Sequence, residues 1–246
     1  MRTILLFAIL AFAACKPNKV ELTAQQIIDK SIIATGGDKI TNSNISFVFR
    51  KRMYNARRNN GAFTLERITM RDAIAIKDVL SNDGFKRYKN SVLISVPDSM
   101  VTRYSNSVNS VHYFSVLPYG LNDNAVYKKL LSNITIKGVD YYKIQVTFSE
   151  DGGGEDFDDV FLYWFRKDNL QLDYLAYKYF TGKGGMRFRD IKDEKVVNGI
   201  RFANYNNYKP KDKNLDFHTI DKAYQDGQLE KLSEIISKNI EVTLFD

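Results

Sequence analysis

The sequence predicts a mostly antiparallel β protein of the α+β class, with a helix near its N-terminal end and a helical excursion in its middle. Several stretches alternate apolar and polar residues, as half-buried strands do. Dipeptides that favour tight hairpin turns, such as Asn60-Gly61, separate these stretches. Aromatic residues make up 13% of the chain and gather in the alternating stretches, which favours strands over helices.

The first element is a helix that we predict over residues 24–35. Thr23 and Gln26 have the spacing of a capping box, in which each side chain binds the backbone N–H of the other residue. Gly36-Gly37 supplies a stop, because glycine readily ends a helix in the left-handed conformation. One face of the segment is apolar, through Ile27, Ile28 and Ile32.

Strands dominate the rest of the chain. Turn signals at Asn60-Gly61, Asp83-Gly84 and Gly138 predict hairpins between them. We expect about ten strands, formed by residues 45–54, 63–70, 73–80, 134–148, 160–165, 172–180, 185–191, 199–208 and, as two short strands, 232–246.

The middle segment, residues 98–121, shows no clean alternation. Val108, Val111, Tyr113 and Phe114 suggest a short helix, which Pro118 and Gly120 would end. We expect this excursion to cross one face or one mouth of the sheet.

An apolar run, residues 4–14, follows Arg2 at the start of the chain. A membrane-spanning helix needs about 20 apolar residues, so this shorter run is more typical of a secretory signal. Ala13 and Ala14 stand directly before Cys15, the single cysteine of the chain. The arrangement resembles the signal of bacterial lipoproteins, although Phe12 stands where that family usually has an aliphatic residue.

The lipoprotein resemblance implies that the thiol of Cys15 receives a diacylglycerol, that the chain is cut just before it, and that the new amino terminus is acylated. It also implies a signal peptide over residues 1–14, a lipid-anchored tether over 15–22 and a single domain over 23–246. The alternative is an ordinary secreted protein, cut near Ala14, in which Cys15 is an incidental free thiol.

The formal charge is +7, with 36 Lys and Arg residues scattered among 29 Asp and Glu residues. Because the basic residues are dispersed and the chain reads as exported, we expect no nucleic acid partner. A mildly basic body suits the neighbourhood of anionic membrane lipid. The stretch 49–58 holds five Lys and Arg residues. It could contact such a membrane or, as the preferred interpretation, form a charged hairpin that resists edge-to-edge pairing.

A closer resemblance rests on stretches that span nearly the whole mature chain, and these are "SFVFRKRMYNARRNNG", "VLSNDGF", "NSVHYFSVLPYGLND", "IKGVDYYKIQVTF", "DDVFLYWF", "LDYLAYKYF" and "GGMRFRD". In element order the chain resembles the LolA/LolB-like group of bacterial envelope proteins. It is most similar to an uncharacterised lipoprotein family, a domain of unknown function, of Bacteroidetes-type bacteria. The resemblance implies an incomplete antiparallel barrel, or curved sheet, around helical elements, with an apolar concave side that shelters lipid acyl chains.

Aromatic residues in the strands are the candidates for lining such a concave side. They would bind a lipid or another apolar ligand, unless they simply fill a packed core. Two arginines that alternate with apolar residues are also candidates, because paired guanidinium groups bind phosphate or carboxylate. The alternative is that these arginines form ion pairs with Asp173 or Asp190. The candidate ligand-binding residues are Phe47, Phe49, Tyr142, Tyr163, Trp164, Tyr174, Tyr177, Arg187 and Arg189.

The stretch 150–159 places six carboxylates and three glycines within ten residues. Ca²⁺ prefers six to eight oxygen ligands, so this stretch is a candidate calcium site, although its spacing fits no EF-hand loop. The alternative is a solvated acidic turn. The candidate ligands are Asp151, Glu155, Asp156, Asp158 and Asp159.

No catalytic motif is present, so we expect a binding protein without enzymatic activity and without a required cofactor. His112 and His218 stand far apart in the sequence, and no Gly-x-Ser-x-Gly nucleophile elbow occurs. The sequence hypothesis is an outer-membrane lipoprotein that faces the periplasm and binds an apolar ligand. The alternatives are a structural or partner-binding lipoprotein with a filled core and, less favoured, an envelope hydrolase. The sequence does not identify a protein partner.

Overall fold

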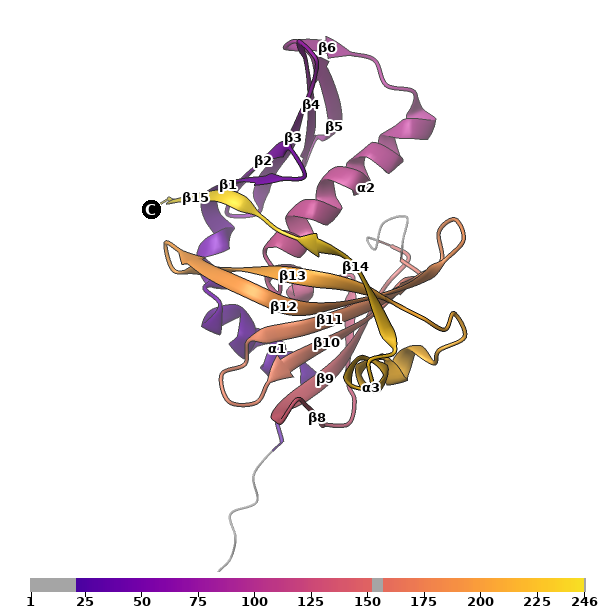
Figure 1. Ribbon diagram of the computed structural model, residues 1–246. Helices are drawn as coiled ribbons and strands as arrows, with labels where there is room; N and C mark the ends of the chain where they lie inside the picture. The colour runs from indigo at the N-terminus through magenta and orange to yellow at the C-terminus, as the bar shows by residue number, and fades with distance from the viewer. Residues whose placement is uncertain (1–20, 152–156, 246) are drawn as a thin grey trace, which may run out of the picture.

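The computed structural model of the chain describes residues 21–151 and 157–245. Within these ranges fifteen strands form two sheets, and every strand pair is antiparallel. The antiparallel architecture that the sequence predicts is therefore confirmed. Strand β14 of one sheet runs into β15 of the other, so the sheets meet at this connection (Figure 1).

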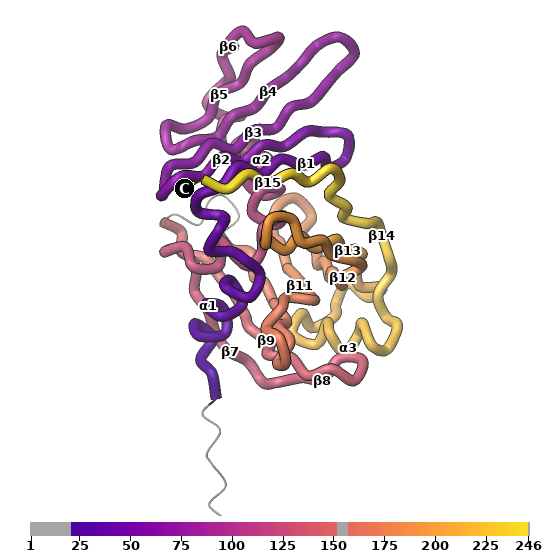
Figure 2. Tube along the Cα trace, turned by 90° about the vertical axis from the view of Figure 1, so that its left-hand side faces the viewer, coloured from indigo at the N-terminus to yellow at the C-terminus, as the bar shows by residue number. Residues whose placement is uncertain are grey.

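The small sheet has seven strands. Its order is β15 (Lys238–Leu244), β1 (Asn42–Phe49), β2 (Arg52–Asn59), β3 (Ala62–Arg71), β4 (Ile74–Ser81), β5 (Gly84–Lys89) and β6 (Val92–Ile94). Apart from β15, it is a meander of consecutive hairpins. Figure 2 shows β15 lying along β1 at the junction with the other sheet.

The large sheet has eight strands. Its order is β14 (Leu229–Ile235), β13 (Ile200–Pro210), β12 (Gly185–Val197), β11 (Leu172–Tyr179), β10 (Val160–Arg166), β9 (Val139–Phe148) and β7 (Val126–Leu130), with β8 (Ile134–Ile136) also paired to β9. Both faces of its centre are buried. On β10, Phe161, Tyr163 and Phe165 belong to one hydrophobic cluster, whereas Leu162 and Trp164 belong to the cluster on the opposite face.

Helix α1 (Ala24–Ala34) confirms the predicted capping box, with Thr23 and Gln26 in reciprocal hydrogen bonds. Its buried residues Ile27 and Ile28 pack against the large sheet. Three 3₁₀ turns accompany the helices, at Gly37–Thr41, Tyr119–Asn122 and Phe217–Thr219.

Helix α2 (Asp98–Ser115) is the predicted excursion, but it has 18 residues and is longer than the sequence suggests. The helix is long because its neighbours, rather than its own apolar face, stabilise it. Arg67 of β3 donates hydrogen bonds to the carbonyl and hydroxyl oxygens of Ser107, and Val108 is fully buried against the small sheet. In Figure 1, α2 lies in the angle between the two sheets.

Helix α3 (Ile220–Gln225) is absent from the sequence prediction. It covers the face of the large sheet opposite α1 and α2, where Ile220 and Ala223 pack in the cluster that contains Trp164. Along the parts of the chain that the structure describes, no helix combines the length and the apolar character needed to cross a membrane.

More strands are present than the ten that the sequence predicts, because some turns use residues other than glycine. Arg50 and Lys51 both adopt positive φ angles, 48° and 62°, and split residues 45–54 into β1 and β2. Asn90 and Ser91 form a similar turn between β5 and β6. Since β1 and β2 both lie inside the small sheet, the interpretation of stretch 49–58 as protection of a sheet edge is wrong.

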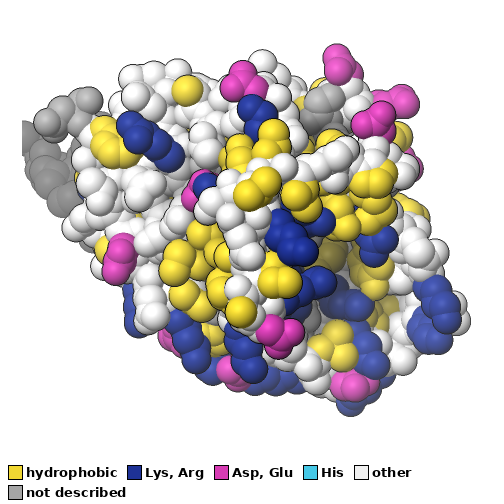
Figure 3. All heavy atoms as spheres, turned by 90° about the horizontal axis from the view of Figure 1, so that it is seen from above, with side chains coloured by type: hydrophobic (Ala, Val, Ile, Leu, Met, Phe, Trp, Pro, Cys, Tyr) yellow, Lys and Arg dark blue, Asp and Glu magenta, His cyan; other side chains and the backbone are white. Residues whose placement is uncertain are grey.

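The segment that forms strands β1 to β6 of the small sheet has a large net positive charge. Residues 42–94 hold eleven Lys and Arg against four Asp and Glu, an excess equal to the net charge of the whole chain, +7. Figure 3, which views the molecule from above, shows Lys and Arg side chains interspersed with hydrophobic ones on this face.

Candidate functional site

A cavity of about 760 Å³ lies between α2 and the inner face of the large sheet, the face toward α1 and α2. Residues from β9 to β14 form its floor, and the C-terminal part of α2, from Asn106 to Ser115, forms its roof. The end of β1 closes one side, with Phe47, Phe49 and Arg50. The cavity thus lies at the place where the two sheets and α2 converge.

The aromatic part of the cavity is built on neighbouring strands. Phe161 of β10 is paired with Tyr177 of β11, and their rings stack with centroids 5.7 Å apart. Phe148 of β9 packs its ring against Phe161 at 5.6 Å. Phe114 approaches from α2, with its ring 6.2 Å from Phe161 and 6.0 Å from Tyr177. These rings give one wall of the cavity an apolar surface.

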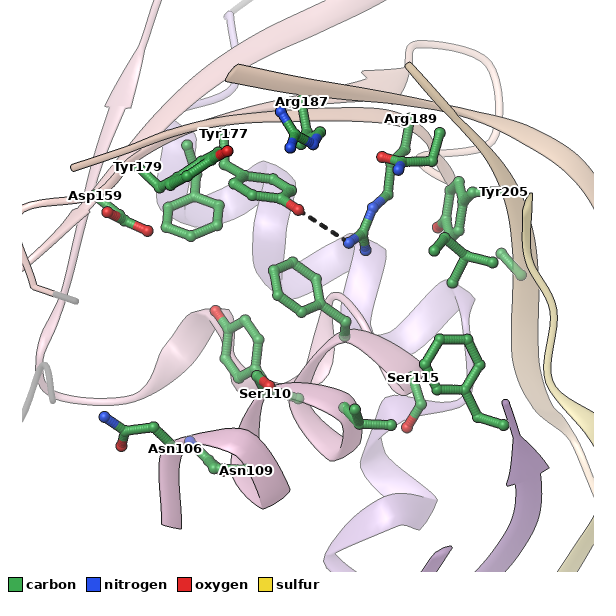
Figure 4. Close-up of a pocket in the computed structure, with 18 of the residues that line it drawn as sticks. Asn106, Asn109, Ser110, Ser115, Asp159, Tyr177, Tyr179, Arg187, Arg189 and Tyr205 are labelled. Carbon is green, nitrogen blue, oxygen red and sulfur yellow. Dashed lines mark hydrogen bonds between the residues drawn. The ribbon is translucent and has the colours of Figure 1, made fainter. Parts of the chain in front are cut away.

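The α2 side of the cavity is mixed, because polar side chains line it together with Val111, Tyr113 and Phe114. Asn106, Asn109, Ser110 and Ser115 all line the cavity, and Figure 4 shows them along the helix below the strand residues. Ser115 donates its hydroxyl to the carbonyl of His112. Helix α2 therefore presents both polar and aromatic side chains to the cavity.

The basic part of the cavity lies on β12. Alternation along this strand turns Phe188 toward the opposite face, into the cluster with Trp164, and leaves Arg187 and Arg189 on the cavity side. The register places Arg187 opposite Tyr177 of β11 and Arg189 opposite Asn207 of β13. Both arginines are half-buried.

Arg189 makes specific contacts inside the cavity. Its Nη2 donates a hydrogen bond to the hydroxyl of Tyr177 at 3.3 Å, which Figure 4 marks as a dashed line. Its guanidinium carbon lies 4.7 Å from the ring centroid of Phe114 and 5.3 Å from that of Tyr177. Arg187 lies over the ring of Tyr179 at 5.2 Å. The basic and aromatic parts of the site are therefore in direct contact.

Neither Arg187 nor Arg189 forms an ion pair with Asp173 or Asp190, the alternative that the sequence offered. Asp173 accepts instead from Tyr141 and Arg201, and Asp190 accepts from Asn206, Tyr208 and Tyr224.

Two aspartates also line the cavity, Asp123 and Asp159. Burial raises the pKa of Asp123, although Lys128 and Arg58 oppose that effect. Asp159 is buried, and one of its carboxylate oxygens accepts the backbone N–H of Phe180 at 3.3 Å.

Five of the nine ligand-binding candidates line the cavity: Phe47, Phe49, Tyr177, Arg187 and Arg189. The other four are not among its lining residues. Tyr163 is fully buried within the core on the same sheet face, beneath α1. Tyr142 lies on the same face of β9 as Phe148, but the two residues are six positions apart, which separates them by about 20 Å along the strand. The ammonium group of Lys167 lies over the ring of Tyr142.

Trp164 and Tyr174 point to the opposite face of the large sheet, where α3 covers them. The indole of Trp164 donates to Asp221, and the ring of Tyr174 lies 5.8 Å from that of Tyr224. No pattern in the sequence indicates α3, which is why the sequence analysis does not predict that this face is covered.

Several lining residues were not among the sequence candidates. Phe161, Tyr205 and Asn207 line the cavity because side chains alternate between the two faces of β10 and β13. The alternation is visible in the sequence, but it identifies these residues only when the face of each strand that borders the cavity is known. The contribution of α2, through Phe114 and its polar face, had no comparable signal.

The acidic stretch falls partly outside the described residues, because Glu155 and Asp156 lie between the two described ranges. Asp151 and Asp158 are exposed, whereas Asp159 faces the cavity. Within residues 21–151 and 157–245, no group of three His, Cys, Asp or Glu side chains is placed to hold a metal ion. Calcium binding by the stretch as a whole stays a prediction. The anchor candidate Cys15 also lies outside the described residues.

The two histidines lie in different surroundings. His112 is buried beside the rings of Phe47 and Tyr54, and its Nε2 donates to the carbonyl of Glu66 at 3.0 Å. Burial lowers its pKa to about 4. His218 is half-exposed, with Asp216 at 3.6 Å from Nδ1 and the amide oxygen of Gln145 at 2.9 Å from Nε2.

Comparison with known proteins gives one family match and several similar structures. The model of a family of unknown function (DUF6503) matches residues 3–237. No curated protein matches the sequence.

Among solved structures, the LolA superfamily protein NE2245 from Nitrosomonas europaea is 13% identical with a TM-score of 0.49, covering 92% of this chain and 95% of that one. A DUF1329 family protein from Desulfovibrio piger is 11% identical with a TM-score of 0.44, covering 89% and 92%. A putative outer membrane lipoprotein-sorting protein domain from Vibrio parahaemolyticus is 10% identical with a TM-score of 0.43, covering 82% and 99%.

Proposed function

We propose that this chain, which belongs to the family of unknown function DUF6503, is an envelope lipoprotein that binds the hydrocarbon chain of a lipid, or another apolar ligand, in the cavity beside α2. The observation that carries the proposal is the cavity itself, about 760 Å³ in volume and walled by aromatic rings. This volume is within the range of small-molecule sites in proteins, about 300 to 1,000 Å³.

The energetics favour a ligand with a long apolar portion. Burial of apolar surface contributes about 25 cal/mol per Å², from which the cost of ordering the ligand is subtracted. Phe114, Phe161 and Tyr177 offer adjoining ring surfaces to such a ligand. The alternative, a structural lipoprotein with a filled core, calls for side chains that close this space, so the cavity favours the binding hypothesis.

The proposed location starts from the first residues of the chain. Ala13, Ala14 and Cys15 after a short apolar run support export and acylation of Cys15, and so a membrane anchor. An outer-membrane position facing the periplasm is the location that we propose for this anchor. Several acyl chains together hold a protein stably on a bilayer. The tether would then keep the cavity close to a lipid source.

Native mass spectrometry after mild extraction from the membrane tests the binding proposal. The expected result is a population of protein that carries a lipid-sized adduct. A matched pair of variants on α2 tests whether that adduct is bound in the cavity. Ser110→Trp places a large ring at a residue that lines the cavity, whereas Thr102→Trp places it at an exposed residue of the same helix outside the lining.

We expect Ser110→Trp to reduce the adduct and Thr102→Trp to leave it unchanged. Titration of the purified full-length chain with 1-dodecanol supplies an independent measure of apolar binding. If extracted protein never carries an adduct and 1-dodecanol does not bind, the proposal is wrong.

A further inference from the structure

The two arginines of β12 have hydrogen-bond donors that the protein leaves largely unused. A guanidinium group carries five N–H donors and no acceptor. Arg189 uses one of them, toward the hydroxyl of Tyr177, and its Nε is buried without any acceptor among residues 21–151 and 157–245. Arg187 also uses one, toward the neighbouring carbonyl of Met186. Neither forms an ion pair with a described carboxylate.

Other buried arginines of this chain are treated differently. Arg67 directs Nε and Nη2 to Asp78 and Nη1 to Ser107. Arg201 directs Nε to Glu194, Nη1 to a backbone carbonyl and Nη2 to Asp173. In both of these buried arginines the protein supplies acceptors for all three guanidinium nitrogens. Unpaired donors that face a cavity are available to a ligand, and leaving a buried donor unsatisfied costs free energy.

The spacing of the two side chains suits one acidic group. Residues two apart on a strand lie about 7 Å apart and project from the same face, so two long, flexible side chains can converge on a single anion. Figure 4 shows Arg187 and Arg189 side by side on the same wall, with Arg189 reaching toward Tyr177. Guanidinium groups bind carboxylates through paired N–H donors, and such charge-assisted bonds are the strong ones.

An apolar surface begins directly beside these donors. The ring of Phe114 lies 4.7 Å from the Arg189 guanidinium, and the rings of Phe161 and Phe148 continue from it into the cavity. We infer that the site takes a single-chain amphiphile with an acidic head, with a carboxylate between Arg187 and Arg189 and its hydrocarbon chain along these rings. This inference rests on the proposed function and adds the chemical class of the ligand.

Three probes separate the contributions of head and chain: dodecanoate, 1-dodecanol and acetate, each titrated into the purified full-length chain by calorimetry. Two charge-assisted hydrogen bonds predict that dodecanoate binds at least about tenfold more tightly than 1-dodecanol. Acetate, which lacks the chain, should bind far more weakly than either. In the double variant Arg187→Gln/Arg189→Gln, the preference for dodecanoate should disappear while 1-dodecanol still binds.

Arg103→Gln is the control for the loss of an arginine, because it removes one positive charge from an exposed residue of α2 outside the cavity lining. It should retain the preference. If the double variant does not fold, Arg187→Gln and Arg189→Lys are made singly; Arg187→Gln should reduce the preference, and Arg189→Lys should keep part of it. Urea unfolding of each variant separates loss of binding from loss of structure.

The outcomes are distinguishable. Equal affinity of the wild-type chain for dodecanoate and 1-dodecanol would overturn the inference and leave the proposed function standing. Binding of acetate as tightly as dodecanoate would replace the amphiphile with a free small anion and overturn the inference too. If neither dodecanoate nor 1-dodecanol binds, the proposed function and the inference fail together.

Discussion

The indole Nε1 of Trp164 donates a hydrogen bond to the carboxylate of Asp221 at 3.0 Å, deep on the face of the large sheet opposite the cavity. The same carboxylate oxygen accepts from the Nζ of Lys143 at 2.7 Å. Asp221 lies on α3, whereas its two partners lie on adjacent strands. One buried carboxylate thus holds the short helix α3 on the sheet.

Replacement of this carboxylate is expected to be costly. Asp221→Ala leaves the buried ammonium of Lys143 without its charged partner, and removal of one partner of a buried pair typically costs about 3 to 5 kcal/mol of unfolding free energy. The measurement is urea unfolding followed by tryptophan fluorescence, since Trp164 is the single tryptophan. The neighbouring exposed residue gives the control: Lys222→Ala should change the free energy by no more than about 0.5 kcal/mol. Equal midpoints for both variants would contradict this role of Asp221.

Stability is expected to fall as the solution becomes acidic, because His112 is buried in its neutral form. Burial, helped by the charges of Arg58 and Arg67, lowers its pKa to about 4, against about 6.5 in an unfolded chain. Between these two values only the unfolded state binds the extra proton. The stabilising contribution is therefore complete above pH 6.5 and is lost progressively as the pH falls to 4, by about 3 kcal/mol in total.

Unfolding free energies measured at several pH values between 7 and 4 test this dependence. His112→Gln keeps an N–H donor for the carbonyl of Glu66 but has no titrating group in this range. The variant should show a flatter profile than the wild type over the same interval. An unchanged profile would assign the acid sensitivity to other groups.

Gly36 is expected to tolerate no side chain. It ends α1 with φ of 72°, and a Cβ at this position would lie 1.9 Å from the carbonyl oxygen of Gly199. Gly36→Ala combines the cost of the left-handed conformation with a backbone clash, which together predict a loss of about 3 kcal/mol. Gly61 has φ of 90° but open space around it, so Gly61→Ala should cost only the conformational part, about 1 to 2 kcal/mol. Similar losses for the two variants would show that the contact with Gly199 is unimportant.

Acylation at Cys15 has a direct test. Cells that express the chain should incorporate labelled palmitate into it, and the protein should sediment with membranes. Cys15→Ala should abolish both the label and the membrane association. Label that persists in the variant would exclude this thiol as the attachment point, and a wild-type chain that takes up no label would favour the alternative of an ordinary secreted protein.

The sequence predicts best the features that are encoded locally. The capping box of Thr23 and Gln26 marks the start of α1, and alternation on β12 places Arg187 and Arg189 on one face. Both patterns depend only on residues next to each other in the chain, so no tertiary contact was needed to interpret them.

The features that the sequence does not predict depend on contacts between distant segments. Arg50 and Lys51 adopt positive φ angles, and because neither position is a glycine, the sequence does not indicate a turn there. Trp164 lies away from the cavity because α3, more than fifty residues later in the chain, covers its face of the sheet. Helix α2 covers the cavity, and the hydrogen bond from Arg67 of β3 to Ser107 helps to fix its position. Periodicity reveals the two faces of a strand but not what covers each of them.

Helix α2 is attached to both sheets, and this has a mechanical consequence. Ser107 near its middle is bonded to Arg67 of the small sheet, while Phe114 near its end packs on Phe161 and Tyr177 of the large sheet. Because α2 contacts both sheets, a displacement of the small sheet relative to the large sheet would also move the helix that covers the cavity.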